Sequence, residues 1–285
     1  MTTQTVGTRR SFGRRPVEVA IRVLLWGYAG LVIAPLSLVV LNSLRPTREI
    51  FRDPIALPKS LNFESFQVAW TEANFSAYFL NSLVITVASV TLATAVSVLA
   101  AYVLGRYRFR GSGLLAVFFL SGLLLPFRLA ILPLFLLLQS LGLVDTRIGL
   151  ILVYAATGIP FSVFILSAFF RQLPGELTEA ARIDGAGEFT IFGRVMLPLV
   201  RPGMATVAIF QFVPLWNDFF FPLVLLRSSD KLTLPVGMTR FFGEFQTDWS
   251  TLFAGIIITT LPLIVLFLVA TKQIIAGLTA GVGKI

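Results

Sequence analysis

The residues of this chain that are capable of polar chemistry are few, and several of them lie inside long apolar segments. The 285 residues include no cysteine and no histidine, so disulfides, thiol chemistry, Cys/His zinc sites and a Ser-His-Asp triad are excluded. We therefore expect a protein that is not an enzyme, and we assign no catalytic and no metal-binding residue. The isolated charges that remain are suited to binding.

Two of these charges, Arg128 and Asp218, lie within apolar runs long enough to cross a membrane. A charge at such depth is costly, so it faces a partner charge or a water-filled path. One interpretation is a structural ion pair, formed between them or with a partner subunit. The other is a solute path on which aromatic, amide and charged side chains contact a polar solute. The residues of that path would be Arg128, Gln211, Trp216, Asn217 and Asp218.

Composition places the chain in a membrane. Hydrophobic residues make up 56% and charged residues 13% of the sequence, with a mean hydropathy of +0.87, whereas a soluble domain is roughly 25% charged. The net charge of +9 is explained by membrane topology rather than by nucleic acid. We expect a multi-pass protein of the cell membrane whose surroundings are the lipid bilayer, with no nucleic-acid partner.

Six apolar runs are each about as long as the roughly 20 helical residues needed to cross the hydrocarbon core. The predicted fold is therefore an all-α integral membrane protein with six transmembrane helices, preceded by a basic N-terminal segment (1–22) and followed by a short tail (276–285). The first run is too long for the core of a signal peptide, so a retained anchor is expected. The six runs are residues 23–44, 79–104, 114–138, 148–170, 203–226 and 252–275.

The distribution of basic residues predicts the orientation. An even number of spans places both termini on one side. Most of the 23 lysines and arginines fall in segments that face the cytoplasm if the N-terminus is cytoplasmic, as the positive-inside rule requires. Both termini and the charged connector 173–202, between the fourth and fifth spans, are therefore predicted to be cytoplasmic.

The connector 173–202 has the local chemistry of two short helices joined by a corner. Pro174 suits a helix start, and Glu176 and Glu179 fall in the first turns, where acidic groups favour the positive end of the helix dipole. Gly185 supplies the permissive backbone of a sharp turn.

The second helix is expected from about residue 188 to residue 196, with Pro198 ending it. A slim, amphipathic helix-corner-helix fits a groove on another protein. The expected apolar contacts are Leu177 and Ala181, and the expected polar contacts are Arg182 or Asp184.

The spaced pattern Glu179-Ala180-Ala181, Asp184-Gly185, Phe192 and Leu197-Pro198 resembles the EAA loop of binding-protein-dependent ABC importer permeases, most closely the maltose-type carbohydrate branch. The segment Trp216-Asn217-Asp218-Phe219 and the stretch LPKSLNFESFQVAW are also similar to sugar permeases, so the resemblance covers nearly the whole chain. It implies that the connector forms coupling helices that dock on a cytoplasmic ATPase. The implied coupling residues are Leu177, Glu179, Ala180, Ala181, Arg182, Asp184, Gly185, Phe192 and Pro198.

The resemblance further implies a permease subunit that imports an oligosaccharide or related polyol. Its implied partners are a second homologous permease, an ATPase dimer and an extracytoplasmic solute-binding protein that docks on segments 45–78 and 227–251, which otherwise are ordinary solvated loops. ATP and Mg²⁺ would be used by the ATPase subunits. This chain binds no cofactor in this interpretation, because its tail GLTAGVGK lacks the glycine spacing and the Ser/Thr of a phosphate loop.

Three alternatives stay open. One is a secondary carrier driven by an ion gradient, although no repeated halves and no coupling-ion site are evident. A second is an ABC importer of a phosphorylated polyol, because Arg128 would suit an anionic group. The third is a membrane scaffold or sensor without transport, in which Asn217 and Asp218 would have no effect on uptake.

Overall fold

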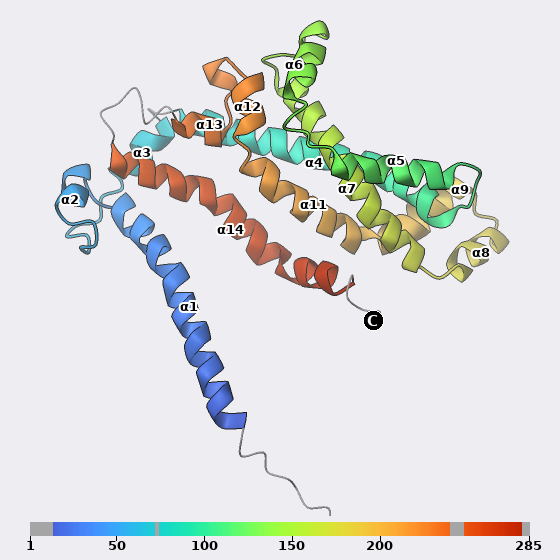
Figure 1. Cartoon of the computed structure of the whole chain (residues 1–285), viewed down its shortest axis with the longest axis horizontal. Coiled ribbons are helices and arrows are strands. Elements are labelled where there is room, and N and C mark those ends of the chain that lie inside the picture. The colour runs from blue at the N-terminus through green and yellow to red at the C-terminus, as the bar shows by residue number, and fades with distance from the viewer. Residues whose placement is uncertain (1–13, 72–73, 240–247, 281–285) are drawn as a thin grey trace, which may run out of the picture.

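The computed structural model describes residues 14–71, 74–239 and 248–280, with side chains between residues 18 and 271, and these ranges fold into helices without any strand (Figure 1). The predicted all-α class is confirmed for this part of the chain. Most of the basic N-terminal segment and residues 281–285 of the predicted tail, which include its phosphate-loop-like end, lie outside the described residues.

Within the described ranges, four helices are long and apolar enough to span a membrane. In hydrocarbon every backbone N–H and C=O has to be satisfied within the chain, so long apolar runs fold as continuous helices. A fifth span is counted only if α11 (Arg201–Trp216) is joined to the preceding residues Glu188–Leu199, from which it is bent by 66°. The four long helices are α1 (Arg14–Ser43), α4 (Phe75–Arg106), α7 (Arg147–Gln172) and α14 (Trp249–Ala280).

The prediction of six continuous spans is not confirmed, because the third and fifth apolar runs are each broken. The third run forms α5 (Ser112–Leu124) and α6 (Ile131–Ser140), two short apolar helices. Leu125, the residue before Pro126, is extended (φ −73°, ψ 124°), since proline disfavours the helical region for the residue that precedes it.

The fifth run ends as α11 at Trp216 and resumes as α12 (Phe220–Leu225). A continuous helix would use the N–H of residue 222 to bond the carbonyl of residue 218, and Pro222 has no N–H. The carboxylate of Asp218 accepts the backbone N–H of Phe221 instead (3.1 Å), so the new helix begins with a satisfied donor.

Two groups of short helices lie at opposite ends of the bundle, whereas α5, α6 and α12 lie along the body between them (Figure 1). We call the residues 173–200 at one end the elbow, and the opposite end the far end. The far end carries α2 (Thr47–Arg52), α3 (Glu64–Thr71), η2 (Ser229–Lys231) and α13 (Leu234–Met238), and the elbow carries α8 (Glu176–Ile183), α9 (Glu188–Thr190), the π-helical turn η1 (Ile191–Met196) and α10 (Leu197–Leu199).

Two helices, α4 and α7, form the centre of the bundle and run parallel. Ser89 approaches the carbonyl of Ile151 (3.5 Å) and Ser97 that of Ile159 (3.4 Å), so the same offset in sequence persists along both helices. Two apolar clusters flank this pair, one toward the far end around Trp216 and one at the elbow around Phe170. The helix pair therefore connects the two ends of the molecule.

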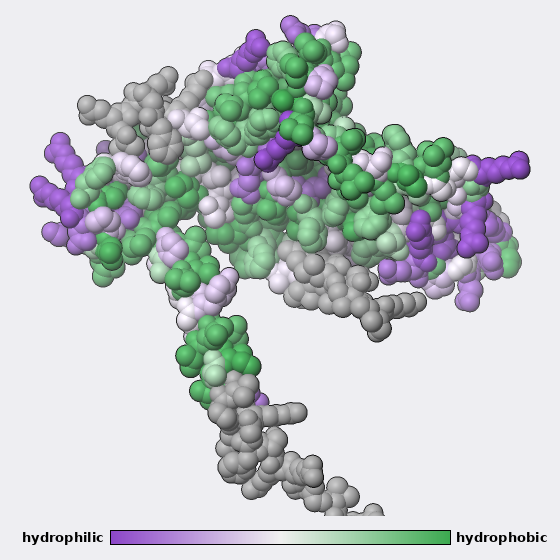
Figure 2. Space-filling model, in the orientation of Figure 1, coloured by the Kyte–Doolittle hydropathy of each residue, from purple (hydrophilic) through white to green (hydrophobic). Residues whose placement is uncertain are grey.

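The surface is apolar along the bundle and polar at its ends, as Figure 2 shows. Large aliphatic and aromatic side chains of α1, α5 and α14 are exposed. Helix α1 leaves the body at an angle and contacts α14 (Figure 1), and none of its most apolar window is buried. An apolar surface of this size belongs in lipid or against another chain.

Candidate functional site

The two breaks in the third and fifth apolar runs bring Arg128 and Asp218 together. Arg128 lies between α5 and α6, and its Nη2 is 3.8 Å from Oδ1 of Asp218, which lies between α11 and α12. The guanidinium also lies 5.9 Å from the ring centroid of Phe220. The sequence prediction that these two charges face each other or a common path is consistent with this geometry. We call Arg128, Asn217 and Asp218 the break site.

The two charges of the break site are held very differently. Tyr154 of α7 donates its hydroxyl to Oδ2 of Asp218 (2.8 Å), and the same oxygen accepts the N–H of Phe221. The side chain of Asp218 is 10% exposed and that of Arg128 is 74% exposed. The carboxylate is therefore fixed by α7 and α12, whereas most of the guanidinium is open to a further partner.

Asn217 is exposed beside them, with its Nδ2 donating to the carbonyl of Val213 (2.9 Å). This bond satisfies a carbonyl at the end of α11 and orients the amide. The side chain of Asn217 is therefore held at the surface, directly before Asp218 in the chain.

Trp216 and Gln211 lie behind the break site rather than on its surface. The indole of Trp216 is 1% exposed, donates to the carbonyl of Thr259 (3.0 Å) and stacks on Phe212. Gln211 is buried and donates to the hydroxyl of Ser162. In this conformation neither side chain faces a solute path, because the two residues point from α11 into the helix packing.

The elbow has the predicted helix-corner-helix form. Helix α8 begins at Glu176 and carries both predicted acidic residues in its first turn. Gly185 has φ +79°, a left-handed conformation that favours glycine, and α9 begins at Glu188.

The second helix of the elbow does not end at Pro198 as predicted. It continues through η1 into α10, and the bend falls at Val200 (φ −93°, ψ 0°). Pro198 is the second residue of α10 and directly follows the π-helical turn η1.

The predicted coupling residues divide between two faces of the elbow. Ala181 and Phe192 pack against the inner apolar cluster, so Ala181 is not an outward contact. Two apolar side chains that the sequence analysis did not select are the most exposed: Phe189 is 94% exposed and Ile183 86%. The outward face also carries Leu177, Glu179, Ala180, Arg182, Asp184 and Gly185.

Glu188 ties the two helices of the elbow together. Its Oε1 accepts from Nη2 and Nε of Arg182 (2.7 and 3.1 Å), and its Oε2 accepts the hydroxyl of Tyr107. These bonds lower the pKa of Glu188, with Tyr107 the larger cause. Burial, together with the bond to Glu188, raises the pKa of Tyr107 well above its usual range. The carboxylate thus stays charged and the phenol stays neutral at ordinary pH.

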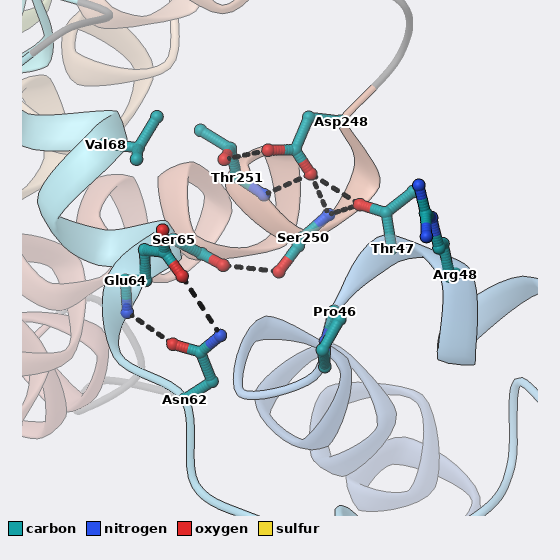
Figure 3. Close-up of a pocket in the computed structure, with 10 residues that line it drawn as sticks. All are labelled: Pro46, Thr47, Arg48, Asn62, Glu64, Ser65, Val68, Asp248, Ser250 and Thr251. Carbon is teal, nitrogen blue, oxygen red and sulfur yellow. Dashed lines mark hydrogen bonds between the residues drawn. The ribbon is translucent and has the colours of Figure 1, made fainter.

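A polar pocket of about 450 Å³ lies at the far end, where the segment after α1 meets the start of α14 (Figure 3). Asp248 accepts the N–H groups of Ser250 and Thr251 and the hydroxyls of Thr47 and Thr251. Burial alone would raise the pKa of Asp248, but these bonds lower it. The lining residues are Pro46, Thr47, Arg48, Asn62, Glu64, Ser65, Val68, Asp248, Ser250 and Thr251.

Comparison with known proteins identifies the class. Residues 93–277 match the family described as binding-protein-dependent transport system inner membrane component. This range includes the break site and the elbow. The chain belongs to this family, and it is a multi-pass membrane permease.

Several individual relatives are permease proteins of sugar transport systems. The diacetylchitobiose uptake system permease protein NgcG of Streptomyces coelicolor is 42% identical over 261 residues, covering 91% of this chain and 86% of that protein. The arabinooligosaccharides transport system permease protein AraQ of Halalkalibacterium halodurans is 38% identical, covering 89% and 91%. The trehalose transport system permease protein SugB of Mycobacterium tuberculosis is 34% identical, covering 92% and 94%.

A solved structure has the same fold. It is the crystal structure of a bacterial ABC transporter involved in the import of the acidic polysaccharide alginate, and one of its chains superposes with a TM-score of 0.82 at 23% identity, covering 95% of this chain and 99% of that chain.

Proposed function

We propose that this chain is one transmembrane subunit of an ATP-driven importer of an oligosaccharide or related polyol. The observation that carries the proposal is the elbow, which presents the uncovered side chains of Phe189 and Ile183 at one end of a membrane bundle. Large apolar groups beside charged ones are typical of a docking face for another protein. The relatives, which are sugar-transport permeases, support this proposal.

In this proposal the elbow is cytoplasmic and docks on an ATPase dimer that binds ATP and Mg²⁺. Closure of the dimer displaces the elbow and shifts the bundle between two conformations, so the pathway opens alternately to the two sides. A second permease chain covers the exposed apolar face of α1, and an extracytoplasmic binding protein docks at the far end near the polar pocket. A related importer has been solved with a periplasmic binding protein.

The proposed solute contacts are the residues of the break site. Asn217 and Asp218 offer amide and carboxylate groups to sugar hydroxyls, and interrupted helices in a membrane are tolerated where they line a cavity. Trp216 and Gln211 support this surface from behind. The exposed guanidinium of Arg128 favours a second candidate solute, a polyol that carries an anionic group such as phosphate.

The test is uptake in cells that lack the chain, complemented with wild type or with Asn217→Ala. Labelled diacetylchitobiose, arabinooligosaccharide, trehalose and a sugar phosphate would be offered in turn. We expect one neutral oligosaccharide to be taken up, with uptake lost on ATP depletion and reduced in Asn217→Ala. Preference for the sugar phosphate would select the second candidate. Uptake that survives ATP depletion and collapses with an ionophore would instead establish a secondary carrier.

A further inference from the structure

The last turn of α4 is hydrogen-bonded to the first helix of the elbow through Arg106. Its Nη1 donates to the carbonyl of Leu173 (2.7 Å), and its Nη2 donates to the hydroxyl of Thr178 (2.7 Å) and to the carbonyl of Pro174 (3.3 Å). Thr178 is buried at this contact. One planar guanidinium therefore joins three acceptors of the α7–α8 connection, a geometry that lysine does not reproduce.

The same turn of α4 also holds the second helix of the elbow. The hydroxyl of Tyr107 donates to Glu188 and lies 3.1 Å from the hydroxyl of Tyr102. The ring of Tyr102 in turn packs 5.0 Å from that of Phe192 and 5.4 Å from that of Phe170, measured between centroids. The two halves of the elbow are thus attached to one point on α4.

Helices α4 and α7 approach each other closely at this point. A Cβ on Gly105 would lie 2.7 Å from Cβ of Phe170, so the two helix backbones are in direct contact. Interfaces packed this tightly transmit displacement instead of absorbing it.

At the far end, α4 holds a second segment. Nδ2 of Asn81 donates to the carbonyls of Asp230 (2.8 Å) and Leu232 (2.9 Å), and the hydroxyl of Ser82 accepts the N–H of Leu234 (2.8 Å). Hence a single helix of 32 residues is hydrogen-bonded to the elbow at one end and to the segment of η2 and α13 at the other.

We propose that Arg106 is the positioning residue that makes the elbow and α4 move as one body, and that α4 delivers this movement to residues 230–234 at the far end. The inference rests on the proposed function, in which a partner ATPase displaces the elbow. A rigid element attached at both ends is the physical requirement for such coupling. Arg106 acts through its three acceptors and needs no contact with ATP or solute.

The first test is solute taken up per ATP hydrolysed, measured with the assembled transporter in proteoliposomes. We expect Arg106→Ala to lower this ratio at least about 10-fold, the effect of losing roughly 1.5–3 kcal/mol of charged hydrogen bonds, while ATP hydrolysis continues. Arg106→Lys should restore part of the ratio of solute taken up to ATP hydrolysed. Arg108→Ala removes an exposed neighbouring charge, and its ratio of solute to ATP should match that of wild type. If wild type itself shows no ATP-driven uptake, that result contradicts the proposed function and not the role of Arg106.

A second measurement keeps the inference testable if Arg106→Ala does not fold. Thr178→Val removes one acceptor at nearly constant volume and should lower the ratio about 2- to 10-fold. Because the chain has no cysteine, Val103→Cys on α4 and Glu176→Cys on α8 can be spin-labelled as a pair. We expect their distance to stay constant on ATP binding in the otherwise native chain and to change when Thr178→Val is added. Wild-type stoichiometry in Arg106→Ala and Thr178→Val, or a distance that changes in the native background, would overturn the inference.

Discussion

At the scale of single residues, Asp218 shows how a charge is kept within an apolar bundle. Tyr154 and the N–H of Phe221 satisfy one carboxylate oxygen, and the other faces Arg128 at 3.8 Å. Removing a buried charge from its water shell is expensive unless hydrogen bonds replace that shell. The contact with Arg128 is long and the arginine side chain is mostly exposed, so the proposed solute would replace this contact at little cost.

Asp218→Asn tests this role of the carboxylate. The amide retains the shape but loses the charge, so bonds worth about 1.5–3 kcal/mol are weakened and uptake should fall roughly 10- to 100-fold. Uptake would be measured in cells at matched membrane levels of the chain. Glu18→Gln removes an exposed charge near the start of α1 and serves as the control; equal uptake by both variants would contradict the proposed solute path.

Asp145 is a residue at which pH controls stability. Its carboxylate accepts the N–H groups of Arg227 and Ser228 (2.8 and 2.9 Å) and the Nζ of Lys231 (3.2 Å). The hydroxyl of Ser228, followed by these bonds, holds the pKa of Asp145 well below its usual range. A lowered pKa in the folded state means that the stabilisation is complete above the unfolded value, about 3.9, and is lost as pH falls below it.

We therefore expect the melting temperature of the purified chain in mild detergent to fall between about pH 4 and pH 2. Asp145→Asn should be less stable at pH 7 by about 1–3 kcal/mol and should lack this part of the acid dependence. Thermal unfolding of both proteins across this range is the measurement. An identical acid profile in the variant would mean that the bonds of Asp145 to Arg227, Ser228 and Lys231 do not cause this acid dependence.

Sequence patterns found Arg128, Asn217 and Asp218 but not Tyr154, which holds the carboxylate. Arg128 and Asp218 stand out because charges are rare in apolar runs. Tyr154 carries the same kind of signal, a hydroxyl within an apolar span, but its role depends on the position of α12. Trp216 and Gln211 are polar in sequence and buried in structure, because the face that a helix turns inward is decided by packing.

At the scale of elements, the elbow depends on one backbone conformation. Gly185 has φ +79°, whereas Gly187, two residues later, has φ −73°, and a Cβ at either position would meet no atom within 4 Å. The two glycines therefore differ in backbone strain and not in available space.

This difference gives a matched pair of variants. Gly185→Ala should destabilise the corner by about 1–2 kcal/mol, and Gly187→Ala should have little effect. Limited proteolysis of the elbow would report the loss of structure, and uptake should fall only in Gly185→Ala. Similar behaviour of the two variants would show that the left-handed turn does not determine the form of the elbow.

The sequence predicted which elements exist better than where they break. The helices α4, α7 and α14 follow from long apolar runs, and α8 follows from Pro174 and two early glutamates. Hydropathy does not register the breaks before α6 and α12, because Pro126, Pro222 and the residues around them interrupt the helix while leaving the run apolar. Pro198, in contrast, predicted a helix end, but the helix continues from the π-helical turn η1 into α10.

At the scale of the whole molecule, the described part of the chain leaves large apolar surfaces uncovered. Helix α1 buries none of its most apolar window, and the elbow exposes Phe189 and Ile183 at the other end of the body. A lipid bilayer covers an apolar helix but not the polar and apolar mixture of the elbow. The molecule as a whole is therefore consistent with a subunit that is completed by other chains.

The proposed binding of an ATPase to the elbow is tested by co-purification. The tagged chain would be isolated in mild detergent as wild type, as Glu179→Lys on the exposed face of α8, and as Glu64→Lys at the far end, with the associated proteins identified and ATP hydrolysis assayed. We predict that an ATPase accompanies wild type and Glu64→Lys and is lost from Glu179→Lys. A wild-type chain that is isolated without any ATPase, yet transports solute, would contradict it.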